Sequence, residues 1–210
     1  MCDGHVPTGC LTVTPDVRCL GIDLAWSEGS LARPANRSGV VALDPSGEIA
    51  AAGWTIGLPA TVEWIERNAH EDTTLFVDAP LVITNLTKQR LAEKQVGQRY
   101  GSWWVSANSS NLASKRQAGV RLRERLEELG WIYRDGLEGP STTGRTLYEC
   151  YPYNLLDAAV CAWTAALWQR DGLQRCQVLG GAEHDGAGGQ LATIVAPARR
   201  EQRRDADCRR

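Results

Sequence analysis

The chain has 210 residues, a net charge of −2 and a pI of about 6.0, so it fits a single domain and lacks the basic character of a protein that coats nucleic acid. This charge does not exclude an enzyme that binds nucleic acid locally. No apolar stretch is long enough to span a bilayer, and the first residues, MCDGHVPTGC, lack a signal-peptide pattern, so we expect a cytoplasmic protein.

Both ends of the chain are expected to lie outside the folded domain. Residues 1–16 are typical of a disordered leader, and Cys2, His5 and Cys10 within it match no standard spacing of zinc ligands. Residues 198–210, ARREQRRDADCRR, form a basic tail that we also expect to be disordered and that could add contacts with phosphates.

Apolar runs and turn formers predict three strands, a helix and a fourth strand in the first half of the chain. Residues 17–26 read as a buried strand, and residues 38–56 read as a hairpin around the turn DPSG. Residues 58–70 carry apolar side chains at helical spacing. The nearly continuous apolar run at 73–83 is typical of a strand that is covered on both faces of a parallel or mixed sheet.

The second half predicts helices that alternate with strands. In chain order the expected segments are a short helix within 86–96, an irregular polar segment with the pair Trp103–Trp104, an amphipathic helix at 113–129, a strand at 146–152, a helix at 154–172 and a small hairpin within 176–198.

A three-strand meander followed by crossover units is the order of the ribonuclease H-like fold. The sequence therefore predicts an α/β protein with a single domain over residues 17–197. Its central mixed sheet has five strands flanked by helices, with a C-terminal strand extension.

Four acidic residues lie at element ends that this fold brings to one sheet edge. Asp23 lies on the first strand, Asp78 on the fourth, Glu149 on the fifth and Asp157 in the first turn of the last helix. Converging carboxylates repel one another unless a cation neutralises them, and Mg²⁺ or Mn²⁺ prefers such oxygen ligands. Two such ions can hydrolyse a phosphodiester bond. The three histidines lie away from these acids, which argues against a zinc hydrolase and against a serine or cysteine nucleophile.

Each acid also has a purely structural interpretation. Asp78 precedes Ala-Pro and could organise a turn, Asp157 could cap its helix, and Glu149 could pair with an arginine. Asp23 is the hardest to explain in this way, because the residues around it in LGIDLAW are apolar.

Basic and aromatic residues in the excursion could bind a substrate. Arg90 and Glu93 share a helix face and could orient a phosphate and a ligand carboxylate, although a surface ion pair is the commoner case for such a spacing. Lys88 and the pair Trp103–Trp104 suit contacts with a nucleic-acid backbone and bases, whereas core packing is slightly favoured for the two tryptophans.

The combination of GIDLAW, FVDAPL, an R-x-x-E pair, YECYP and LLDAAVCAWTAA resembles a bacterial and archaeal family of predicted nucleases of the ribonuclease H-like fold, domain-of-unknown-function family 429. The resemblance runs from about residue 18 to about residue 197. It implies that Asp23, Asp78 and Asp157 hold Mg²⁺ or Mn²⁺, and that Glu149 is a further ligand or supports the ligands. It also implies that Arg90 and Glu93 line the pocket.

We therefore expect a two-metal nuclease that hydrolyses phosphodiester bonds of DNA or RNA. Two other functions stay open. The first is a nucleotide-dependent phosphotransferase of the actin-like kinase type, in which GIDLAWSEGS would be a strand and phosphate loop. The second is a non-catalytic ribonuclease H-like binding module.

Overall fold

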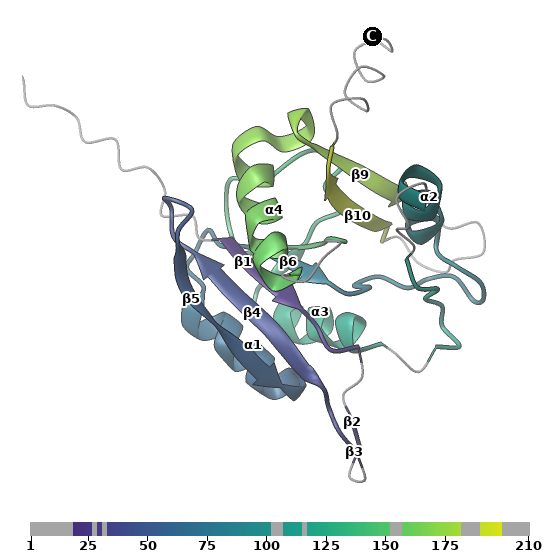
Figure 1. Ribbon diagram of the computed structural model, residues 1–210, viewed down its shortest axis with the longest axis horizontal. Helices are drawn as coiled ribbons and strands as arrows, with labels where there is room; N and C mark the ends of the chain where they lie inside the picture. The colour runs from purple at the N-terminus through teal and green to yellow at the C-terminus, as the bar shows by residue number, and fades with distance from the viewer. Residues whose placement is uncertain are drawn as a thin grey trace, which may run out of the picture.

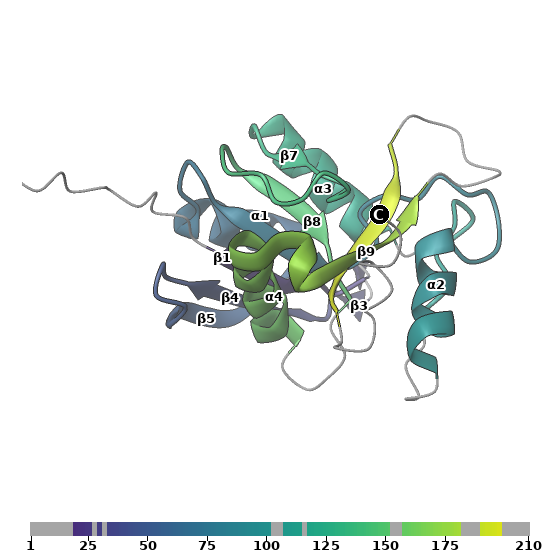
Figure 2. The same cartoon turned by 90° about the horizontal axis from the view of Figure 1, so that it is seen from above.

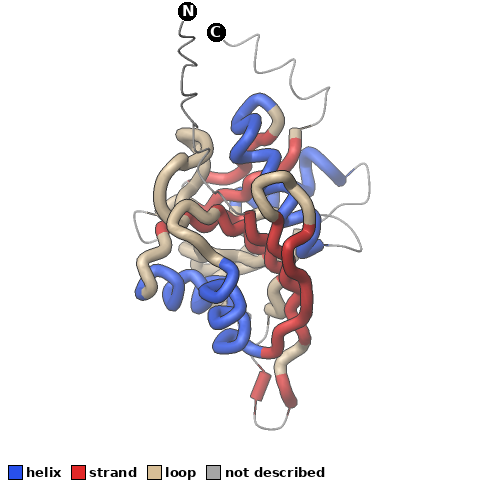
Figure 3. The backbone as a smooth tube through the Cα atoms, turned by 90° about the vertical axis from the view of Figure 1, so that its left-hand side faces the viewer, coloured by secondary structure: helices blue, strands red, loops and turns tan. Residues whose placement is uncertain are grey.

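The computed structural model describes residues 19–26, 29–30, 33–101, 107–114, 117–151, 157–181 and 190–198. Its centre is a mixed six-stranded sheet in the order β5-β4-β1-β6-β8-β7, with helices on both faces (Figure 1, Figure 3). The strands of this sheet are β1 (Cys19–Asp23), β4 (Arg37–Leu43), β5 (Ile49–Ile56), β6 (Thr74–Asp78), β7 (Ile132–Tyr133) and β8 (Thr146–Glu149). The predicted α/β class, with a mixed sheet flanked by helices, is confirmed.

The sheet combines two kinds of strand pairing. β4 pairs antiparallel with both β1 and β5, whereas β6 is parallel to β1 and to β8. The prediction of five central strands was wrong by one, because β7 adds a short parallel strand at the β8 edge. β7 has only two residues, which is too few for an alternating pattern to reveal it in the sequence.

Two small sheets lie beside the central one. β2 (Gly29–Ser30) pairs with β3 (Arg33–Pro34), and β9 (Cys176–Gly181) pairs antiparallel with β10 (Ala192–Pro197). The β9–β10 pair forms the expected C-terminal strand extension, and α2 packs against it (Figure 2).

The helices are α1 (Gly57–Asn68), α2 (Leu91–Tyr100), α3 (Ala118–Glu128) and α4 (Asp157–Asp171). α2 begins later than predicted, at Leu91, because residues 84–90 form a loop in which the Asn85 side chain donates hydrogen bonds to three backbone carbonyl groups. α3 begins at Ala118 and not at residue 113. None of the helices in the described ranges has the length and apolar character needed to cross a bilayer.

The two faces of the sheet bury separate hydrophobic cores. Alternate residues of β1 and β6, such as Ile22 and Val77, pack with α1 and α3 on one face. The intervening residues, such as Phe76, pack with α4 on the other face. Below, these are called the α1 face and the α4 face.

Gly21 allows α4 to lie directly on β1. A Cβ atom at this position would be only 2.1 Å from the Ala158 carbonyl oxygen and 2.2 Å from the Ala162 nitrogen. Real Cβ atoms do not approach backbone atoms so closely, and Ala158 follows Asp157 at the start of α4. The missing side chain of Gly21 therefore sets where Asp157 lies relative to β1.

We expect Gly21→Ala to lower the free energy of unfolding by about 3 kcal/mol or more, because the new methyl group overlaps backbone that cannot rotate away. Urea denaturation followed by circular dichroism measures the change. Gly53→Ala in β5 is the matched control, because no atom lies within 4 Å of the position of its Cβ. Equal stability of the two variants would show that α4 does not contact β1 in this way.

Candidate metal centre

Three aspartates from three separate elements meet on the α4 face. Asp23 ends β1 and Asp78 ends β6, and the two are direct partners in the parallel register. Asp157 is the first residue of α4, where a carboxylate also interacts favourably with the helix dipole. One carboxylate oxygen from each of the three lies within 4.8 Å of those of the other two, and all three residues are partly exposed. We call these residues the aspartate trio.

Burial and mutual repulsion disfavour the ionised forms of Asp23 and Asp78 in the aspartate trio. Burial raises the pKa of Asp78 to about 8, and the charges of Asp23, Asp157 and Glu149 contribute to this shift. Burial, followed by the charge of Asp157, also raises the pKa of Asp23. A divalent cation among these oxygens would remove the repulsion and favour the ionised carboxylates.

Glu149 lies at the same sheet edge but on the opposite face. In the register of β6 and β8 its partner is Val77, not Asp78, so its side chain shares the α1 face with Val77. Its carboxylate accepts a hydrogen bond of 2.9 Å from the Leu81 backbone N–H. The predicted group of four acids is thus divided: three form the aspartate trio, and Glu149 has other partners.

The main partner of Glu149 is Arg90, which is only 1% exposed. The Arg90 guanidinium donates to both carboxylate oxygens of Glu149, at 2.6 and 2.9 Å, and through Nε to Glu93 at 2.8 Å. Burial lowers the pKa of Arg90, but the two carboxylates more than offset this effect, so the net shift is upward. Such a two-pronged contact satisfies the ionised forms of both partners.

This buried ion-pair network fixes the chain that follows Asp78. Arg90 also donates to the Val82 carbonyl oxygen at 2.9 Å, and Glu93 accepts hydrogen bonds from the backbone N–H groups of Arg90 and Ser110. The network therefore joins β8, the segment after β6 and the start of α2. Through these contacts on the α1 face, the network fixes the end of β6, where Asp78 lies.

Arg90, Glu93, Glu149 and Asp78 line one small cavity. Its free space is only about 10 Å³, which suits a single water molecule and no substrate. Arg90 and Glu93 are a buried pair and not the surface pair that the sequence left open. The aspartate trio, by contrast, is partly exposed.

The remaining predicted contacts are less closely tied to the aspartate trio. Lys88 is exposed in the loop before α2, has a φ of 65°, and accepts hydrogen bonds on its carbonyl oxygen from the side chains of Asn85 and Asn111. Its ammonium group stays a predicted substrate contact. Trp103–Trp104 and Cys2, His5 and Cys10 lie outside the described residues.

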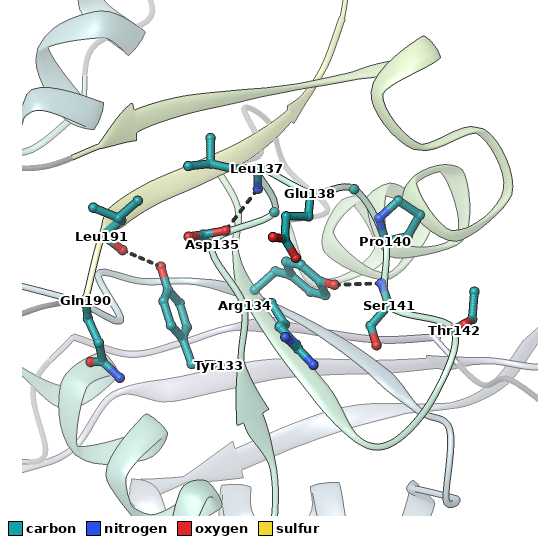
Figure 4. Close-up of a pocket in the computed structure, with 13 residues that line it drawn as sticks. Tyr133, Arg134, Asp135, Leu137, Glu138, Pro140, Ser141, Thr142, Gln190 and Leu191 are labelled. Atoms are coloured by element: carbon teal, nitrogen blue, oxygen red, sulfur yellow. Dashed lines mark hydrogen bonds between the residues drawn. The ribbon is translucent and has the colours of Figure 1, made fainter.

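A larger polar pocket of about 600 Å³ lies beyond β7, at the loop 134–142 and residues 190–191 (Figure 4). The Tyr133 hydroxyl group donates to the Leu191 carbonyl oxygen at 3.0 Å, and Asp135 accepts from the Leu137 backbone N–H at 3.0 Å. None of the three aspartates lines this pocket, so its size does not make it the metal site.

Sequence reasoning missed two glycines that shape the aspartate trio. Gly21 lies two residues before Asp23 and admits α4, as described above. Gly39 is the β4 partner of Asp23, and because it has no side chain, the Asp23, Trp54 and Ala158 side chains can all approach its backbone. The only available signal was the spacing G-x-D in β1, which places the glycine and the aspartate on the same face of a strand.

Comparison of the chain with known protein families finds no match, and neither the curated proteins nor the solved structures contain a match. Function must therefore be inferred from the geometry of the aspartate trio and its surroundings.

We expect Asp78→Asn to stabilise the metal-free protein at pH 8. Because the pKa of Asp78 is raised above the ordinary value of 3.8, its contribution to stability is complete below about pH 4 and is lost as the pH rises through 8. The asparagine variant does not undergo this loss, so its free energy of unfolding should exceed that of the wild type by about 1–3 kcal/mol at pH 8.

Urea denaturation in a chelating buffer at several pH values between 4 and 8 measures this difference. Glu71→Gln, at an exposed position, is the control and should follow the wild-type curve. If Asp78→Asn loses stability with pH as steeply as the wild type, the pKa of Asp78 is not raised by burial and by the neighbouring acids.

We expect Arg90→Met to destabilise the protein by about 3–5 kcal/mol, because it leaves Glu149 and Glu93 buried without their cation. Arg90→Lys should recover little of this loss, since an ammonium group cannot form the two-pronged contact. Arg67→Met is the control: Arg67 pairs with Glu63 at the surface, where an ion pair contributes less than about 1 kcal/mol. Comparable losses at the two arginines in thermal and urea unfolding would contradict the buried network.

Proposed function

We propose that the protein is a metal-dependent nuclease whose active site is the aspartate trio. The observation that carries this proposal is the convergence of three carboxylates from β1, β6 and α4 on one face, with ligand oxygens within 4.8 Å of one another. Side chains from three rigid elements hold ligand positions well, and hydrolysis of phosphodiester bonds by metal ions needs such an acidic set.

The strand order supports the same proposal. The five strands β5-β4-β1-β6-β8, with the first three antiparallel, follow the order of the ribonuclease H-like fold, to which β7 adds one strand. Asp23 and Asp78 then lie on its central pair of strands. The resemblance of GIDLAW, FVDAPL and LLDAAVCAWTAA to a family of predicted nucleases points to the same three aspartates.

The donor set of the aspartate trio fits Mg²⁺ or Mn²⁺. All three donors are hard oxygen ligands of the kind these ions prefer, and their ligand atoms lie within 4.8 Å of one another. When two such ions are bound, they supply an activated water molecule and stabilise the leaving oxygen. The protein supplies the positions: Asp23, Asp78 and Asp157 bind the ions, while Glu149 and Arg90 hold the end of β6 as positioning residues.

We expect the wild type to bind Mn²⁺ in isothermal titration calorimetry without nucleotide, and Asp23→Asn to lose this binding by at least about tenfold, because it removes one of three charged ligands. Asp44→Asn, in the exposed turn between β4 and β5, is the matched control and should bind like the wild type. Fluorescent DNA and RNA strands then report cleavage that depends on Mn²⁺ and on Asp23.

The other possible results of these binding and cleavage measurements support different functions. No Mn²⁺ binding, with or without nucleic acid, would mean that the aspartates are structural and that the protein is not such a nuclease. Binding that requires a nucleotide would favour the phosphotransferase. Metal binding without cleavage of any strand would favour a non-catalytic binding module.

A further inference from the structure

Trp54 is exposed on the edge strand β5. Its side chain is 68% exposed, and that of Ile56, two residues along the same strand, is 57% exposed. Tryptophan is usually well buried, so such an exposure next to a candidate active site calls for an explanation. β5 forms the outer edge of the sheet (Figure 3).

Trp54 lies on the same face as the aspartate trio. Across β4, the partner of Trp54 is Gly39, and the partner of Gly39 on the other side is Asp23. Directly paired residues share a face. Thr55, by contrast, points to the α1 face, where its hydroxyl group forms a hydrogen bond of 2.7 Å with that of Thr61 in α1.

Gly39 is buried, and the side chains of Trp54 and Asp23 both approach its backbone. The position that a Cβ atom on Gly39 would occupy is 3.6 Å from Cζ3 of Trp54 and 3.7 Å from Cβ of Asp23. Ala158, at the start of α4, contributes only a methyl group, 3.3 Å from the same point. The tryptophan ring and the aspartate side chain thus flank the same glycine, and the exposed ring of Trp54 lies beside the aspartate trio.

A cationic residue lies on this face as well. Arg37 is the next residue of β4 on the same face, where it pairs with Ile56, and it is exposed. Among the described residues no salt bridge to an acidic side chain is recorded for Arg37. Aromatic side chains next to a cation are typical of surfaces that bind single-stranded nucleic acid.

We propose that Trp54 is a stacking platform for an unpaired base of a single strand whose phosphate lies at the aspartate trio, with Arg37 contacting the neighbouring backbone. This subsite rests on the nuclease function proposed above and names its substrate class. A base inside a duplex is stacked on both sides and cannot lie flat on Trp54, so the site selects single strands.

The test measures binding and cleavage of a fluorescent 12-nucleotide thymidine strand, and of the same strand with abasic sites, by the full-length protein. Ca²⁺ is used for binding and Mn²⁺ for cleavage. We expect Trp54→Ala to weaken binding of the thymidine strand about tenfold and to leave binding of the abasic strand unchanged, because only the first strand has bases to stack. Trp54→Phe should recover part of the loss.

Trp163→Ala is the matched control, because Trp163 is also exposed, at 51%, but lies on α4 and outside the paired residues described above. It should bind both strands like the wild type. A uridine strand tested in parallel shows whether the site distinguishes RNA from DNA, and either preference is compatible with stacking on Trp54.

The proposal is overturned if Trp54→Ala binds both strands as the wild type does, or loses both equally. It is also overturned if the variant only changes the oligomeric state in light scattering, which would make β5 an edge for pairing with a second copy. Mn²⁺ titration distinguishes failure of the stacking subsite from failure of the nuclease function itself. A wild type that binds Mn²⁺ and cleaves, with Trp54→Ala unchanged, retains the nuclease and rejects only the stacking subsite.

Discussion

The candidate site depends on the direct contact between α4 and β1 at Gly21. Because Gly21 has no side chain, the backbone of Ala158 and Ala162 can approach the strand to a distance that any Cβ atom would prevent. This approach brings Asp157 to the end of β1, where Asp23 is located, and the parallel register of β1 and β6 adds Asp78. One close contact between backbones therefore assembles three carboxylates from distant parts of the chain.

The alternation of side chains along strands then divides the acids between two tasks. Asp78 and Glu149 end neighbouring strands, but Glu149 pairs with Val77 and so faces the other side of the sheet. On that side it meets Arg90, and the ion pair with Glu93 and Glu149 is closed off from solvent. The trio on the α4 face stays partly exposed and has unfavourable charge repulsion, while both acids on the α1 face accept hydrogen bonds from the buried Arg90 guanidinium. The partly exposed aspartates, and not the buried acids, are therefore the candidate cation ligands.

The two faces also differ in how much space lies next to the acids. The cavity between Asp78 and Arg90 has room only for a water molecule, whereas the aspartate trio is partly exposed on the α4 face. On that face the strand register places Gly39 and Trp54 in line with Asp23 toward the edge of the sheet, with Arg37 beside them on β4.

The sequence by itself determined the α/β class, most strands and helices, and the three aspartates, because apolar periodicity and carboxylates inside apolar runs are local signals. It did not reveal β7, whose two residues carry no period, and it grouped Glu149 with the aspartates. Only the tertiary structure decided that grouping, since a shift of one residue in register moves a side chain to the other face. It alone also decided the roles of Gly21, Gly39 and Trp54. The structural role of each residue depends on which backbone or side chain lies opposite it. That neighbour is set by pairing between segments far apart in the chain.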